Sequence, residues 1–122
     1  MRQDAKFWEA VKQIREKDAR FQPDAYAFVM EALDHTVRGL PQRRHVTAEE
    51  LLRGMCGHAK ERFGLLAHTV LASWGIAAGR DVGRIVYQLV DAGVLAKQEC
   101  DRYEDFDKDF DLKEMLEDKY FD

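Results

Sequence analysis

The side chains in this sequence that could most readily bind a metal or act in catalysis are a cysteine and two histidines, Cys56, His58 and His68. Thiolate and imidazole groups bind zinc, and a cysteine with a histidine is also a nucleophilic pair. The surrounding pattern is helical, and residues two apart on a helix point to different sides, so Cys56 and His58 do not converge on one ion. Nothing in the sequence supplies the orienting carboxylate of a catalytic pair. We therefore expect no metal site, no cofactor and no catalytic residue, and hence no enzyme.

A second pattern is an alternation of aspartates toward the C-terminal end. The run resembles the D-x-D-x-D half of an EF-hand calcium loop. The sixth and twelfth places of that loop take glycine and a bidentate glutamate, whereas this sequence has Phe110 and Leu116 there. An EF-hand is therefore excluded, and the pattern indicates an extended arm with its aromatic side chains inward and its carboxylates in water. The aspartates are Asp105, Asp107, Asp109 and Asp111.

Basic and polar side chains on one predicted helix, and on one loop, form a candidate interaction surface. Arginine contacts phosphates, and arginine and glutamine read base edges, so these residue types suit nucleic acid as well as a protein partner. Asp91 lies on the same helix and opposes a phosphate backbone, which needs clustered cations. The candidate residues are Arg43, Arg44, Arg80, Arg84, Tyr87 and Gln88.

The helix that positions most of these residues lies in the most strongly patterned stretch, 74–95. Its apolar residues follow the i, i+3, i+4, i+7, i+8 spacing of one buried stripe. Asp81 lies in the first turn, and Gly93 stands where a left-handed residue ends a helix, followed by Val94 to pack back. Helix, glycine-containing turn and helix is the order of helix-turn-helix and winged-helix modules. The stripe comprises Val82, Ile85, Val86, Leu89 and Val90.

The preceding part predicts three helices. The first begins at Asp4 and ends near Asp18, with Phe7, Val11 and Ile14 buried and Trp8 beside them. The second begins at Pro23, a residue suited to a first helical turn, and ends near Arg38 before Gly39 and Pro41. The third begins at a capping box, Thr47-Ala48-Glu49-Glu50, flanked by Val46 and Leu51 as a hydrophobic staple. Its buried stripe is Leu52, Met55, Cys56, Ala59 and Phe63, and Gly64 ends it.

The remaining segments are less regular. Residues 65–74 are apolar through Leu66, Val70, Leu71 and Trp74 and predict a short buried helix, although a strand also fits the run. Residues 94–97 and 100–106 allow a small β-hairpin without a typical turn sequence. Residues 111–116 repeat the capping spacing and suggest a short last helix.

Length and composition limit the class of protein. At 122 residues, with 46% hydrophobic and 34% charged residues, the chain has the size and composition of one folded helical domain. It shows no signal peptide or transmembrane run, and its two cysteines lack a C-x-x-C spacing, so we expect free thiols and a cytoplasmic protein. From Glu99 onward 11 acidic residues face 4 basic ones, whereas the preceding part is net basic. The acid is therefore concentrated at one end.

We expect a mainly α, compact single domain, 1–122. It comprises an N-terminal helical pair (1–45), a winged-helix-like region (46–106) with a helix-turn-helix and a small hairpin, and an acidic C-terminal arm (107–122).

Four stretches of the chain carry a resemblance to a known group of proteins. They read R-H-V-T-A-E-E-L-L-R-G, F-G-L-L-A-H-T-V-L-A-S-W-G-I, D-V-G-R-I-V-Y-Q-L-V-D-A-G-V-L-A-K and E-D-F. With the earlier D-A-R-F and A-Y-A-F-V-M-E-A-L, they make the chain similar, nearly end to end, to a lineage-restricted family of short bacterial conserved hypothetical proteins of unknown function. Its members tend to place threonine or serine before the central aspartate, where this chain has Ala78-Gly79-Arg80, which implies a weaker helix cap. The resemblance implies a fold and a compartment, and no catalytic residue.

These observations favour a protein–protein interaction or assembly module that needs no cofactor. The alternative is a nucleic-acid-associated regulator that uses the winged-helix-like region, although the acidic arm repels phosphate. No membrane partner is expected.

Overall fold

The computed structural model describes residues 5–42, 46–95 and 116. In the described residues up to 95 the chain forms five α-helices and one 3₁₀ helix and no β-strand, so the mainly α prediction is confirmed. The elements are α1 (Ala5–Lys17), α2 (Pro23–Arg38), α3 (Ala48–Phe63), the 3₁₀ helix η1 (Gly64–Leu66), α4 (Ala67–Ser73) and α5 (Gly79–Asp91).

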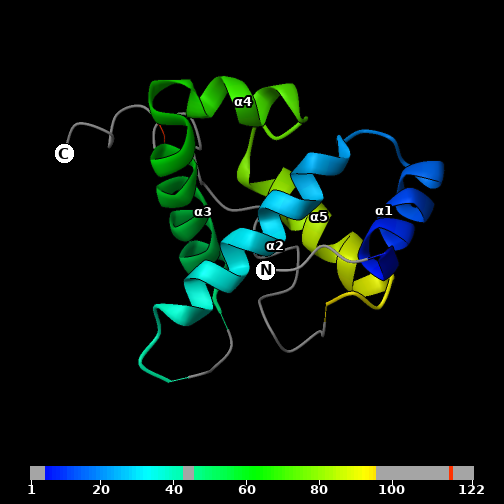
Figure 1. The fold of residues 1–122 in the computed structure, drawn as a ribbon, viewed down its shortest axis with the longest axis horizontal. Coiled ribbons are helices and arrows are strands. Elements are labelled where there is room, and N and C mark those ends of the chain that lie inside the picture. Colours follow the sequence, from blue (N-terminus) through cyan, green and yellow to red (C-terminus); the bar gives the residue numbers. More distant parts are fainter. Residues whose placement is uncertain (1–4, 43–45, 96–115, 117–122) are drawn as a thin grey trace.

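Helix α2 is the centre of the packing. It crosses the middle of the molecule with α3 on one side and α1 on the other (Figure 1), and it contacts α5 as well. The sequence explains this position, because α2 is apolar over a wide arc and buries residues on two adjoining stripes. Its buried residues are Ala25, Tyr26, Phe28, Val29, Ala32 and Leu33.

Helix α5 buries the stripe that its spacing predicts. Val82, Ile85 and Leu89 are fully buried and Val86 nearly so, while Val90 is half-buried. The helix ends in a Schellman motif, in which the Val94 amide donates to the Leu89 carbonyl (2.9 Å) and the Gly93 amide to the Val90 carbonyl (3.0 Å). Gly93 has the left-handed φ of 79° that the motif requires, so the predicted glycine stop is confirmed.

The capping box of α3 is formed as predicted. The Glu50 amide donates to Thr47 Oγ1 (3.1 Å), and the Thr47 amide donates to Glu50 Oε1 (3.0 Å). Val46 and Leu51, the predicted staple, are both fully buried. Two amides that the helix itself cannot satisfy are thereby paired.

Thr47→Ala is expected to cost about 1 kcal/mol of stability, because the Glu50 amide loses its acceptor. The denaturant midpoints of the two proteins measure this loss, with Thr47→Ser as the control that keeps the hydroxyl. If Thr47→Ala and the parent protein have the same denaturant midpoint, the cap does not stabilise α3.

The predicted buried face of residues 65–74 is wrong in part. A helix forms, but Leu65 and Leu66 belong to η1 and are 72% and 63% exposed. The reason is the turn at Gly64, whose φ of 58° breaks the register of α3, so that α4 restarts at Ala67. Ala67 and Leu71, four apart on α4, then face the core.

Several predicted features fall partly or wholly beyond the described residues. Val94 and Leu95, predicted to begin a strand, close α5 instead, and both of their amides donate to the Leu89 carbonyl. The rest of the predicted hairpin, the Asp4 cap and the acidic arm lie outside the described residues, except that Leu116 is helical and buried against the core.

Candidate functional site

The structure places the α5 candidates on and beside one outer face. Arg80 and Arg84 are exposed and Tyr87 is 52% exposed, as the i, i+4, i+7 spacing dictates once the opposite stripe is buried. Gln88 lies half-buried on the flank of this face. Arg43 and Arg44 lie outside the described residues, so a single surface shared with α5 stays a prediction.

Gln88 is held within the molecule on both sides of its amide. The Tyr26 hydroxyl donates to Gln88 Oε1 (2.7 Å), and Gln88 Nε2 donates to Asp18 Oδ2 (3.1 Å). The other Asp18 oxygen accepts from the Arg20 amide (3.1 Å). These linked hydrogen bonds tie α5 to α2 and to the turn after α1, so the Gln88 side chain is a fixed part of the surface rather than a free reading group.

The Tyr26 hydroxyl in these linked bonds is a reliable donor. Burial, followed by the nearby Asp18 carboxylate, raises the pKa of Tyr26 to about 12, against an opposing effect of Arg15. Both causes disfavour the phenolate, so the hydroxyl keeps its proton throughout the physiological range.

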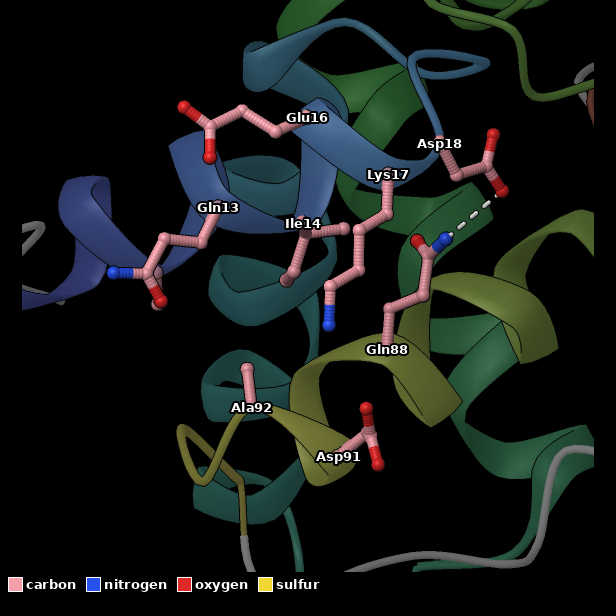
Figure 2. A pocket seen from close by; sticks show the side chains of 9 residues that line it. Gln13, Ile14, Glu16, Lys17, Asp18, Gln88, Asp91 and Ala92 are labelled. Atoms are coloured by element: carbon pink, nitrogen blue, oxygen red, sulfur yellow. Dashed lines mark hydrogen bonds between the residues drawn. The ribbon is translucent and has the colours of Figure 1, made fainter.

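A groove between α1 and α5, the α1–α5 groove, opens beside Gln88. It has a volume of about 640 Å³. Figure 2 shows Lys17 reaching from α1 toward α5 across this space, with the Asp18–Gln88 bond at one end and Asp91 on the α5 side. Its lining combines small or apolar side chains with charged ones, namely Ala10, Gln13, Ile14, Glu16, Lys17, Asp18, Gln88, Asp91 and Ala92.

The charge of the α1–α5 groove is mainly negative. Three carboxylates line it against one ammonium group, that of Lys17. Asp18 is engaged by Gln88 and Arg20, whereas Glu16 and Asp91 form no hydrogen bond or ion pair with any residue in the described ranges. Sequence reasoning noticed Asp91 but missed the groove, because the approach of α1 to α5 leaves no local signal.

The N-terminus of α5 is capped from within the chain. Asp81 Oδ2 accepts from the Ala77 amide (2.9 Å) and the Ala78 amide (3.0 Å). Ala78 has no side-chain acceptor to return, so only half of a capping box is made, which agrees with the weaker cap expected from its sequence. A carboxylate therefore already lies at the N-terminal end of α5, bonded to the two amides that precede the helix.

A second polar cluster joins α2 to α3. Glu31 Oε1 pairs with Arg62 Nη1 (3.1 Å) and lies 3.4 Å from His58 Nε2. The His58 ring stacks between Phe28 and His35, with centroid distances of 5.2 and 5.4 Å. His58 Nδ1 is buried without a hydrogen-bond partner among the described side chains and backbone. The side chains of this cluster stack and pair with one another and do not point toward a common ligand position.

The described residues contain no set of three side chains able to hold a metal ion. Burial raises the pKa of the Cys56 thiol to about 12, against an opposing effect of Lys60. The thiol is therefore protonated at neutral pH, whereas a nucleophile or a zinc ligand must be a thiolate. Cys56 packs as a small apolar core residue.

Comparison with models of protein families, with curated proteins and with solved structures gave no match. The resemblance to the family of short bacterial proteins therefore stays a prediction. None of the helices between residues 5 and 95, as far as the chain is described, is long and apolar enough to cross a membrane.

Proposed function

We propose that the protein is a protein–protein interaction or assembly module, which presents the outer face of α5 and the adjoining α1–α5 groove to a protein partner. This function requires no cofactor, metal or catalytic group. Its surface combines exposed cations, an exposed aromatic ring and a groove, at Arg80, Arg84, Tyr87 and Gln88.

The observation that carries the proposal is the acidic flank of α5. A duplex lying along Arg80 and Arg84 also approaches the C-terminal end of the helix, where Asp91 is unpaired within the described part of the chain and the adjoining groove is lined by three carboxylates. Carboxylates there repel the phosphates whose neutralisation supplies most nonspecific affinity. A protein surface, with both charge signs available, meets no such penalty.

The alternative is a nucleic-acid-associated regulator with a winged-helix-like centre. Its support is the order α3, α4, a turn containing Gly75 and then α5, together with the exposed Arg80 and Arg84. Arg43 and Arg44 would add phosphate contacts. The Asp81 carboxylate, bonded to the Ala77 and Ala78 amides just before α5, places a negative charge at that end of the helix and disfavours phosphate capture there.

A titration with nucleic acid separates these two functions. We expect negligible binding of random-sequence duplex or single-stranded DNA by the full-length protein at physiological salt, where nonspecific binders reach about 10⁻⁴–10⁻⁶ M. Fluorescence anisotropy at several salt concentrations measures it. Submicromolar binding with a steep salt dependence, lost in Arg80→Ala/Arg84→Ala, would overturn the protein-binding proposal and establish the alternative.

The positive test is photo-crosslinking in the native cell, with a crosslinking residue introduced at Arg84 and, as a control, at Arg53 on α3. Both positions are exposed helix positions occupied by arginine. The proposal expects a discrete protein adduct at position 84 that is absent at position 53. Equal labelling at both positions, or none at 84, counts against a partner on α5.

A cytoplasmic location is part of the proposal. Its support is that Cys56 is a buried free thiol, the state that cysteines keep in a reducing compartment.

A further inference from the structure

We propose that the α1–α5 groove binds a protein segment in which an arginine or lysine stands beside a bulky apolar side chain. The inference rests on the proposed function and names the chemistry of the partner. It starts from the shape of the groove, whose volume of about 640 Å³ lies within the range of sites that enclose ligand or peptide side chains.

The apolar part of the groove accounts for the bulky side chain. Ala10 and Ala92 contribute only methyl groups, one from each wall, and Ile14, a residue of the buried core, also lines the groove. Small residues on both walls leave space that an apolar side chain of a partner fills, and that burial is the main source of affinity in such a groove.

The charged part accounts for the cation. Glu16 and Asp91 stand on opposite walls and are unpaired within the described part of the chain, while Asp18 is already engaged. Lys17 crosses the groove on a flexible side chain and forms no ion pair with either carboxylate in the described ranges (Figure 2). It can swing aside, so an incoming guanidinium or ammonium group meets the Asp91 carboxylate, while Glu16, whose side chain points away from α5 in Figure 2, adds negative charge at the rim of the groove.

The fixed wall accounts for specificity. Gln88 is held by Tyr26 and Asp18, so the end of the groove does not rearrange when a partner enters. A preorganised wall reduces the entropy lost on binding and limits the length of the side chain that fits.

Two fluorescein-labelled helical peptides test the inference. The first carries leucine and arginine at i, i+4 spacing on an alanine background, and the second has each arginine replaced by glutamate. At physiological salt the full-length protein is expected to bind the arginine peptide, in a salt-dependent way, and not the glutamate peptide. In a ¹⁵N spectrum the side-chain amide signal of Gln88 is expected to shift on addition of the arginine peptide.

Three variants locate the binding. Glu16→Gln/Asp91→Asn removes two groove charges, and Ala10→Phe fills the groove without changing charge; each is expected to weaken binding about tenfold. The matched control Glu49→Gln/Glu61→Gln removes two exposed charges from α3 and is expected to change binding by less than about twofold. Thermal unfolding of each variant verifies that it folds.

Three results would overturn the inference. Equal weakening by the control means attraction to the overall charge, equal binding of the two peptides means apolar adhesion only, and no binding of the arginine peptide means that the groove takes another occupant. If one of these results is obtained but a protein is crosslinked at position 84, the groove inference is wrong and the proposed function stands. If no protein is crosslinked at position 84, the proposed function is wrong as well.

Discussion

Leu89→Asp is expected to unfold the protein. Leu89 is fully buried on the central stripe of α5, and its carbonyl also closes the end of the helix by accepting the Val94 amide. An unpaired carboxylate at this place costs several kcal/mol, against a total stability of about 5–15 kcal/mol for an ordinary domain. The loss of helical circular dichroism and of a cooperative thermal transition measures the effect.

Two further substitutions show whether burial is the cause. Leu89→Met conserves most of the volume and is expected to cost less than about 1.5 kcal/mol. Arg84→Asp introduces the same carboxylate on the exposed face of the same helix and is expected to change stability by about 0.5 kcal/mol. A Leu89→Asp protein with an unchanged thermal midpoint would mean that the stripe of α5 is not core.

The helices of this protein could be predicted because their signals are local. Pro23 and Arg38 bound α2 as predicted, since proline suits a first turn and glycine follows the last one. Thr47 and Glu50 lie three residues apart, so their reciprocal bonds are visible in the sequence. Each signal lies within one or two helical turns, where spacing alone determines which groups meet.

The exposed leucines show where periodicity fails. Leu66, Val70 and Trp74 recur every four residues, as on one face of a helix, but the pattern assumes one continuous helix. A single left-handed residue, Gly64, ends α3 and shifts the register, which turns Leu65 and Leu66 outward. Glycine was expected to end α3, yet the effect of its φ on the following residues depends on how α4 docks.

The exposure of the arginines on the candidate surface could be predicted from the sequence, but the hydrogen bonds of Gln88 could not. Arg80 and Arg84 are exposed because they lie opposite a stripe that must be buried. Gln88 lies at the edge of the exposed face rather than opposite the buried stripe. Its hydrogen-bond partners, Tyr26 and Asp18, are 62 and 70 residues away in the chain. Contacts at such separations follow from packing, for which one sequence holds no local signal.

Gly75→Ala is the second substitution with a large expected effect. Gly75 has a φ of 99°, and a Cβ atom there would lie 2.8 Å from the Arg20 carbonyl oxygen and 3.0 Å from Phe21 Cδ1. The neighbouring bond from the Gln22 amide to the Trp74 carbonyl (3.1 Å) holds the two turns together, so neither backbone can move away alone. Conformational strain and the clash together are expected to cost about 2–5 kcal/mol.

The contribution of that close approach can be separated from the contribution of the left-handed backbone. Gly93 also has a positive φ, 79°, but a Cβ atom there meets nothing within 4 Å, so Gly93→Ala is expected to cost only about 1–2 kcal/mol. Gly57 is exposed within α3 with open space around it, and Gly57→Ala is expected to stabilise by about 0.5–1 kcal/mol. Denaturant unfolding of the three variants should therefore rank Gly57→Ala above Gly93→Ala above Gly75→Ala. If Gly75→Ala costs no more than Gly93→Ala, the contact between the turn before α5 and the turn after α1 is looser than the structure indicates, and the end of the α1–α5 groove formed by Asp18 and Gln88 loses its rigid support.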